Sequence, residues 1–439
     1  MTSIRVCHSR RDWFRILGLG AAGLSSSGWL DALAADASAQ PSRKRSLIVL
    51  WLNGGPSTID LWDLKPGQAN GGPYREIDSA VPGLRISEHL PQLAARARHL
   101  ALVRSMATKE GDHSRATFVA HTGVPPQGAI RFPTLGSLVA KELGQSGAEL
   151  PSTVCIAPRR NSDLDAHSAG FLGVEFAPLL IGENADYDPA NADPDRILRV
   201  ANLPRAAGVD EQGLASRIEL LRRADAEFAQ TRPGAGVEGH RASLDRAVRM
   251  MQQRASTTFD LSSEPAEMRD RYGRTLFGQG CLLARRLVER EVPFVEVTLD
   301  GWDTHQNNFE RVAELSRHLD TAWSALIDDL ESRGLLERTM ILCLGEFGRT
   351  PKINGTVGRD HFPAAWSVAM TGGGIRGGTV VGRTSPDGTT VEDRPVTIPD
   401  LLTTVCTAIG IDPLKQNLSN VDRPIRIVDK SARPIVELL

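Results

Sequence analysis

Six short apolar runs, rich in β-branched residues, alternate with segments of helical spacing along this chain. Runs of this length and composition are typical of strands buried on both faces of a sheet. Strands that alternate with helices over such a length predict an α/β fold, namely a three-layer α/β/α sandwich with a mostly parallel central sheet. The runs cover residues 46–52, 100–103, 153–157, 293–299, 340–344 and 366–370.

Helical spacing of apolar residues predicts the second kind of element. We expect helices over about 87–98, with Ser87 as the N-cap, and over 214–229, 239–255, 264–290, 308–334 and 398–409. Residues 158–263 are rich in charges, Asn, Asp and Gly, and predict a largely helical insertion into a domain that covers residues 40–439.

The first 39 residues have the pattern of an export signal. Arg10 and Arg11 precede a modestly apolar segment over residues 16–33, and residues 37–39 form an Ala-Ser-Ala site before Gln40. The pattern predicts a twin-arginine signal peptide, the twin-arginine export machinery as a partner, and a periplasmic or extracellular protein. A basic amphipathic helix is the alternative. Glycines and serines interrupt the apolar segment, which disfavours a membrane anchor, and the mature chain offers no other transmembrane candidate.

Charge and cysteine usage restrict the function classes. Residues 1–39 contain four Arg and three Asp, so the mature chain has 47 basic and 50 acidic side chains, a formal charge near −3. This near-neutrality argues against a general nucleic-acid binder. Four widely separated cysteines would remain, with no Cys-x-x-Cys pair that would suggest zinc or redox chemistry. They are Cys155, Cys281, Cys343 and Cys406.

Acidic, imidazole and guanidinium groups gather next to glycines in the last third of the chain. The three stretches are residues 300–305, 345–351 and 358–363, and two of them directly follow predicted strands. Strand ends of this kind line the ligand crevice of an open α/β sheet, so we expect the chemistry there.

Seven motifs together resemble a large exported family of unassigned function, of the DUF1501 type, within the alkaline phosphatase and sulfatase superfamily. The resemblance covers roughly residues 44–430 and implies an alkaline phosphatase-like fold. Its motifs lie at residues 51–57, 60–66, 113–123, 301–305, 345–351, 358–361 and 398–402.

The resemblance also implies a site. Catalytic members of the superfamily hold one or two divalent cations at strand ends, where a Ser, Thr or formylglycine attacks phosphorus or sulfur. Transferred position by position, the resemblance implies Ser114 as the nucleophile beside His113, and Arg349 as a ligand of the ester. The implied ligands of zinc, manganese, magnesium or calcium are Asp60, Asp303, His305, Glu346 and His361.

The chain departs from the superfamily pattern at two ligand positions. Asn53 stands where the first strand end normally offers a carboxylate, and Phe347 stands where relatives have a histidine. The remaining set suits one metal ion better than two. No Cys-x-Pro-x-Arg or Cys-x-Ala-x-Arg signal is present, which argues against an ordinary sulfatase.

Structural roles are the alternative for each of these residues. In that interpretation Asp60 closes its turn, Ser114 is an ordinary N-cap, and His113 packs within its turn. Asp303 with His305, and Glu346 with Arg349, are then structural pairs. His89, His99, His240 and His318 lie in helical patterns rich in charge and are expected at the surface, whereas His121 and His167 carry no sequence signal.

Two functions of different classes are consistent with these patterns. The first is an exported, metal-dependent hydrolase of sulfate or phosphate esters on an anionic glycan or other anionic ester. The second is a binding or assembly protein that keeps the fold with a degenerate metal site, which Asn53 and Phe347 favour.

Overall fold

The computed structural model describes the chain from residue 45 onward, with short gaps. The described residues are 45–145, 147–159, 164–183, 192–200, 203, 205, 208–231, 235–251 and 257–439. The predicted signal peptide lies outside them, as does part of the predicted insertion. By its contacts the chain divides into Met1–Ser42 and Arg43–Leu439, and every described residue belongs to the second unit.

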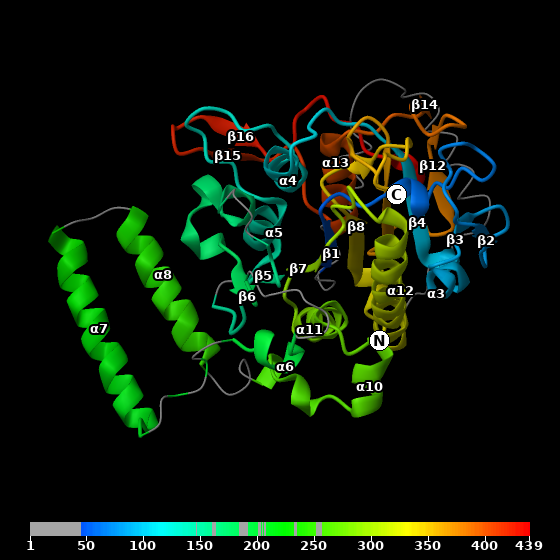
Figure 1. Ribbon diagram of the computed structural model, residues 1–439. Coiled ribbons are helices and arrows are strands. Elements are labelled where there is room, and N and C mark those ends of the chain that lie inside the picture. Colours follow the sequence, from blue (N-terminus) through cyan, green and yellow to red (C-terminus); the bar gives the residue numbers. More distant parts are fainter. Residues whose placement is uncertain are drawn as a thin grey trace, which may run out of the picture. The chain divides into compact units, whose positions relative to one another are not determined.

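An eight-stranded sheet forms the centre of the domain (Figure 1). Its strands pair in parallel, except that β11 runs antiparallel to both of its neighbours. A mostly parallel sheet is thereby confirmed. In order across the sheet the strands are β12 (Thr379–Val381), β4 (Leu100–Met106), β11 (Trp366–Gly372), β8 (Thr339–Leu344), β1 (Ser46–Asn53), β7 (Phe294–Asp300), β5 (Thr153–Ile156) and β6 (Leu179–Ile181).

Helices cover both faces of this sheet, which confirms the three-layer sandwich. Successive side chains of a strand point to opposite faces, and in β1 Ile48 and Leu50 join one buried cluster while Leu47 and Val49 join the other. The first cluster takes in α3 (Pro91–Ala95), α11 (Leu276–Glu289) and α12 (Asn308–Ser332). The second takes in α4 (His113–Thr122), α5 (Leu135–Leu143) and α13 (Ile398–Ile409).

Smaller elements surround the sandwich. Helices α7 and α8 lie side by side, joined by an ion pair of Arg222 and Asp245 at 2.7 Å (Figure 1). The helices outside the two layers are α6 (Pro194–Ile197), α7 (Glu211–Thr231), α8 (Ala235–Met250) and α10 (Ala266–Arg271). Four strand pairs lie outside the sheet: β2 (Glu76–Asp78) with β3 (Arg85–Ser87), β9 (Gly348–Arg349) with β10 (His361–Phe362), β13 (Arg383–Thr384) with β14 (Val391–Asp393), and β15 (Gln416–Leu418) with β16 (Pro424–Arg426).

Two predicted helices were wrong in extent. Ser87 does not cap a helix over 87–98, because it pairs with Glu76 in a strand and the helix begins only at Pro91. The helix predicted over 264–290 is divided into α10 and α11. Gly273 has φ +82° between them, and the Thr275 side chain caps α11 by accepting the N–H of Gly278.

The four cysteines of the described chain are all buried, and none forms a disulfide. Burial raises the pKa of the Cys281, Cys343 and Cys406 thiols, that of Cys406 to about 12. Such thiols behave as small apolar side chains. Within the same residues, no helix is both long enough and apolar enough to cross a membrane.

Candidate functional site

The carboxyl ends of β1, β7 and β8 meet at one edge of the sheet and form the floor of a cleft. The Asn53 side chain at the end of β1 donates a hydrogen bond to Asp300 Oδ1 at the end of β7, over 2.7 Å. A cavity of about 320 Å³ opens here, and His113, Ser114 and Asp303 are among its lining residues. The cleft therefore lies where an α/β sheet is expected to bind ligands.

Helix α4 presents its N-terminus to this cleft. Asp112 is the N-cap, and its carboxylate accepts the N–H of Arg115 over 3.1 Å. His113 and Ser114 are thus the first two helical residues, and both line the cavity. Peptide dipoles give a helix N-terminus a partial positive charge, which favours an anion beside Ser114.

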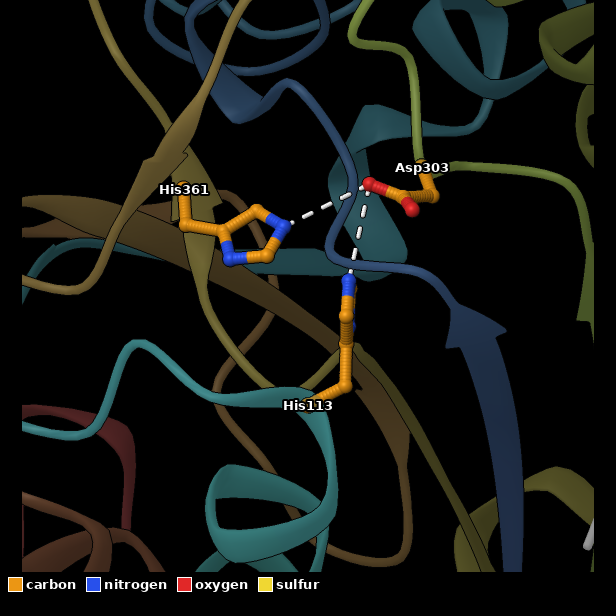
Figure 2. Close-up of side chains that lie close together, drawn as sticks. All are labelled: His113, Asp303 and His361. Carbon is orange, nitrogen blue, oxygen red and sulfur yellow. Dashed lines mark ion pairs between the residues drawn. The ribbon is translucent and has the colours of Figure 1, made fainter. Parts of the chain in front are cut away.

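Two histidines from distant parts of the chain converge on one carboxylate. The Nε2 atoms of His113 and His361 each lie 3.5 Å from Asp303 Oδ1. Figure 2 shows a nitrogen of each ring pointing toward the same oxygen of the Asp303 carboxylate, so that the three side chains form a triangle. Among the described residues, this is one of two groups of His, Cys, Asp and Glu whose ligand atoms all lie within 4.8 Å of one another.

The far nitrogens of both rings are already engaged. His113 Nδ1 lies 2.6 Å from Glu346 Oε1, and His361 Nδ1 lies 2.7 Å from the carbonyl oxygen of Gly111. Because these partners are acceptors, each Nδ1 carries the proton, and in neutral rings both Nε2 lone pairs face Asp303. His113 Nε2 is buried, with no hydrogen-bond partner in the described chain. Metal-binding histidines are oriented in this way, so the residues fit a divalent cation.

Charge is concentrated at this point of the cleft. Burial lowers the pKa of His113, but Asp303 and Glu346 outweigh it and raise that pKa to about 9. Although burial opposes it, His113 and Arg349 hold the pKa of Asp303 well below its usual range. Burial lowers the pKa of His361. A proton and a divalent cation would compete for the same imidazole lone pairs, so metal affinity is expected to rise with pH.

His305 stands beside this trio at the solvent side. Its Nε2 lies 3.2 Å from Asp303 Oδ1 and 3.0 Å from His361 Nε2, and its Nδ1 lies 2.7 Å from Asp360 Oδ1. The structure therefore brings three of the five predicted ligands together, Asp303, His305 and His361, and adds His113, which was predicted as a catalytic residue.

Glu346 lies behind His113 rather than among the converging ligand atoms. Besides holding His113 Nδ1, it accepts the N–H of Gly54 over 3.0 Å, and its side chain is buried. Gly54 has φ +111°, and a Cβ there would lie 2.4 Å from the backbone nitrogen of Asp303, so only glycine fits. This contact fixes Glu346, the end of β1 and Asp303 relative to one another.

Arg349 is buried beneath the cleft. Its guanidinium donates to the carbonyl oxygens of Gly54, Gly55 and Arg359, and also to Asp303. These contacts occupy its donors inside the protein. The position suits orientation of the Asp303 carboxylate better than the predicted contact with an ester.

Asp60 is not brought into the cleft. It is fully buried and accepts hydrogen bonds from Ser57 at 2.6 Å and from Asn308 at 2.8 Å. Arg359 donates to both of its oxygens, over 2.8 and 2.9 Å. Asp60 and Arg359 therefore form an internal ion pair that joins the turn after β1 to the loop before β10.

Arg159 is a cleft residue that the sequence analysis missed. It lies just beyond the end of β5, lines the cavity, and its Nε is 2.8 Å from Asp300 Oδ2. Its side chain is 32% exposed, whereas that of Arg349 is 0% exposed. The strand-end rule applied to β5 would have found it, but residues 158–263 were set aside as an insertion.

Phe347 packs against the two histidines of the cleft. Its ring centroid lies 5.0 Å from that of His113 and 4.7 Å from that of His361, and the side chain is fully buried. An apolar ring at this place supplies no ligand, which favours one metal ion over a pair.

Comparison with known proteins identified one matching family model. The model, described as "Protein of unknown function (DUF1501)", matches residues 44–439. A comparison with curated protein sequences gave no match.

Solved structures with a similar chain path include a sulfatase, a periplasmic domain and a phosphonate monoester hydrolase. PsFucS1 sulfatase from Pseudoalteromonas sp. is 12% identical, with a TM-score of 0.43, over 88% of this chain and 72% of that one. The C-terminal periplasmic domain of EcEptC from Escherichia coli, solved in complex with Zn, is 10% identical, with a TM-score of 0.40, over 89% and 87%. The phosphonate monoester hydrolase SpPMH from Silicibacter pomeroyi is 13% identical, with a TM-score of 0.38, over 84% and 74%. At these identities and TM-scores the likeness assigns neither activity nor substrate to this chain.

Proposed function

Because the chain belongs to the DUF1501 family, whose function is unknown, we propose a function from the geometry of its cleft: metal-dependent hydrolysis of sulfate or phosphate esters. One observation carries the proposal. Two imidazoles, each held through Nδ1 by an acceptor, turn their Nε2 atoms to one carboxylate oxygen, next to a serine at a helix N-terminus.

The ligands in this proposal are His113, Asp303 and His361, with His305 at the open side. Imidazole and carboxylate together suit zinc first, and manganese, magnesium or calcium less well. Such an ion supplies Lewis acidity toward an ester oxygen and a lowered pKa for the attacking group. Glu346 and Arg349 orient His113 and Asp303 rather than contact the substrate.

The remaining cleft residues bind and attack the ester. Ser114 lines the cavity beside His113, where its deprotonated oxygen would bond to phosphorus or sulfur as the bond to the ester oxygen breaks. The departing alcohol would take a proton from water, and a second water would then break the bond to Ser114 and release sulfate or phosphate. Arg159 takes the anion-binding role that the sequence analysis gave to Arg349, since it reaches the cavity and is partly exposed. From the family resemblance, esters on anionic polysaccharides are the first substrates to test.

Export by the twin-arginine pathway is part of the proposal, because Arg10 and Arg11 precede an apolar segment and an Ala-Ser-Ala site. Replacement of both arginines by lysine should leave the uncleaved protein in the cytoplasm. Unchanged export of that variant would contradict the pathway.

Metal content and activity together test the hydrolase. The mature protein should hold a divalent ion in the cleft and should cleave a nitrophenyl sulfate or phosphate. His361→Ala should lose that ion and the activity, whereas His240→Ala should lose neither, because His240 is an exposed histidine of α8. Equal metal content in the two variants would remove the ligand assignment.

The nucleophile needs a separate variant. Ser114→Ala should keep the metal and lose activity by about a thousandfold or more, since only the attacking oxygen is removed. Thr117→Ala is the matched control, because Thr117 lines the same cavity one helical turn further on. If both variants keep full activity, attack by Ser114 is excluded.

A non-catalytic binding protein is the second candidate. Phe347 packs against both histidines, and the neutral Asn53 side chain bonds to Asp300 at the first strand end. These features would suit a cleft that holds an anionic glycan without cleaving it. Little or no metal in the cleft and no turnover of any ester, together with saturable binding of a sulfated polysaccharide, would favour this candidate.

A further inference from the structure

A second group of side chains that can bind a metal lies inside the domain. It is separate from His113, Asp303 and His361, which we call the cleft trio. It consists of His121 near the end of α4, His167 in the short 3-10 helix Leu164–His167, and Glu296 in β7. All three are buried, and the Glu296 side chain is 1% exposed. Their ligand atoms lie within 4.8 Å of one another. We call this group the interior cluster.

Glu296 interrupts the apolar pattern of β7. Its neighbours Val295 and Val297 belong to the core on the α11 and α12 side, and Phe294 belongs to the core on the other side. By strand alternation Glu296 shares the side of Phe294, under α4 and α5. A carboxylate in such a place is costly unless positive charge or a metal compensates it.

Both histidines turn Nε2 to this carboxylate. His121 Nε2 lies 3.0 Å from Glu296 Oε2, and His167 Nε2 lies 3.3 Å from Glu296 Oε1. His121 Nδ1 lies 2.8 Å from the carbonyl oxygen of Thr117, to which it donates its proton. In a neutral ring the Nε2 lone pair then faces an anion, an arrangement that is stable only with a proton or a cation between the two atoms.

His167 lies between the interior cluster and the cleft. Its Nδ1 is buried and has no hydrogen-bond partner among the residues that the structure describes. The ring also lines two cavities, a small one of about 30 Å³ shared with His121 and Glu296, and the cleft cavity of about 320 Å³. His167 thus borders both cavities, so the interior cluster lies next to the cleft but is separate from it.

From this arrangement we propose that His121, His167 and Glu296 bind a zinc ion, distinct from the ion in the cleft. Two imidazoles and one carboxylate form a common zinc-binding set, with bonds of about 2.0–2.2 Å. Neighbouring ligand atoms of a tetrahedral site are then about 3.3 Å apart, and one ligand atom from each residue of the interior cluster lies within 4.8 Å of the others. The Thr117 carbonyl fixes the His121 ring from behind, as in other histidine metal sites.

The interior ion has a structural role. It joins α4 to β7, and the same two elements carry the cleft: α4 begins with His113, and β7 leads to Asp303. His113 and His121 are eight residues apart, about 12 Å along the helix. Zinc at the interior cluster thus anchors the inner end of the helix whose outer end holds a cleft ligand.

The first experiment counts zinc in a protein whose cleft ligands are removed. The full mature chain carrying Asp303→Ala and His361→Ala is produced in zinc-supplemented medium, purified, freed of unbound metal by gel filtration, and analysed by elemental mass spectrometry. We expect close to one zinc per chain. Addition of Glu296→Gln, which keeps the side-chain shape, should reduce zinc to near zero, whereas addition of His240→Ala should not. A folded double variant without zinc overturns the proposal.

The second experiment needs no variant and so does not depend on whether Glu296→Gln folds. Crystals of the wild-type protein grown with zinc are measured at the zinc absorption edge. An anomalous peak between His121, His167 and Glu296 supports the proposal, and its absence in a well-ordered map overturns it. In that case a proton between His121 and Glu296 explains the contact, and the cleft proposal stands, because it depends on His361 and on ester turnover.

Discussion

The two His and carboxylate groups of this protein share one local design in two different environments. In both, a histidine donates through Nδ1 to an acceptor and turns Nε2 to a carboxylate. In the cleft, His113 and Asp303 line a cavity of about 320 Å³, and the Asp303 side chain is 48% exposed, whereas that of Glu296 is 1% exposed. The comparison teaches that burial, rather than ligand type, separates a site suited to chemistry from one suited to stability. An open ion can exchange its solvent for substrate, and an enclosed ion cannot.

Replacement of each carboxylate by alanine should give the largest difference between the two groups, measured as the free energy of unfolding. Glu296→Ala should destabilise the protein by about 3–5 kcal/mol, because it leaves buried partners uncompensated. Asp303→Ala should cost less, since the Asp303 side chain is 48% exposed and the buried guanidinium of Arg349 keeps its hydrogen bonds to the carbonyl oxygens of Gly54, Gly55 and Arg359. Denaturant unfolding of both variants, monitored by circular dichroism, gives the difference. Equal losses would show that the two carboxylates contribute equally to the stability of the fold.

Loss of the Glu346 charge, which orients the cleft ligand His113, should give the next largest effect, a weaker binding of metal in the cleft. Glu346→Gln keeps the size of the side chain but removes the charge that holds His113 Nδ1, and it should weaken cleft metal binding by about 10–100-fold. The interior cluster should keep its ion, because Glu346 is not one of its ligands. Zinc titration by calorimetry measures both sites. A variant that binds zinc as tightly as the wild type would assign Glu346 a purely structural role.

Chelation should separate the sites in time. We expect a chelator to remove the cleft ion first, because its ligands face solvent, while release of the interior ion waits for local opening of the core. Zinc remaining after increasing times in chelator, followed by elemental analysis, should show two phases. A single fast phase that empties the whole protein would contradict an enclosed second ion.

An ion pair without histidine should give the smallest change in stability and serves as a reference for the two His and carboxylate groups. Arg96 on the loop after α3 binds both oxygens of Asp328 in α12 over 2.6 Å, and these bonds hold the pKa of Asp328 below its usual value. The pKa of an Asp side chain in the unfolded chain is about 4. Because the pKa of Asp328 is lower in the folded protein, the ion pair stabilises the fold at pH values above about 4. That stabilisation is lost as the pH falls through the folded pKa.

Arg96→Gln should therefore cost about 0.5–1 kcal/mol at pH 7. The difference from the wild type should shrink as the pH falls below about 4. Urea unfolding across this pH range is the measurement. A difference that stays constant down to about pH 2 would show that Arg96 acts through packing rather than charge.

Much of the fold was predictable because strand and helix periodicity are local properties. The run 46–52 became Ser46–Asn53, and the helix over 398–409 became Ile398–Ile409, where Thr397 and Asp400 form a capping box. The predicted helix over 264–290 failed at Gly273, where a positive φ breaks a continuous helical pattern. The edge strand β6, with three residues, and β12, also with three, are too short to give a periodic signal.

Only some residues of the candidate site could be predicted from the sequence, mainly those that follow the ends of strands. Asp303, His305 and His361 follow strands or lie in the motifs of the family, and the structure brings them together. Asp60 and Arg349 lie in the same motifs, but their charges are compensated inside the protein by partners such as Arg359 and Asp303, which are distant in sequence.

The interior cluster could not be predicted in this way, because His121, His167 and Glu296 lie far apart along the chain. Glu296 also looks like a single irregularity in an apolar strand. Only the tertiary structure shows that the three side chains meet.

None of the four buried cysteines of the described chain forms a disulfide. This bears on which metal ion the interior cluster would bind. A domain that needs no oxidation can complete its fold in a reducing compartment, before any passage across a membrane. Affinity alone ranks copper above zinc at sites of this kind, so the ion that a cell supplies during folding decides which one is enclosed. For this protein, the place of folding would then determine the identity of the interior ion, whatever metals surround the finished molecule.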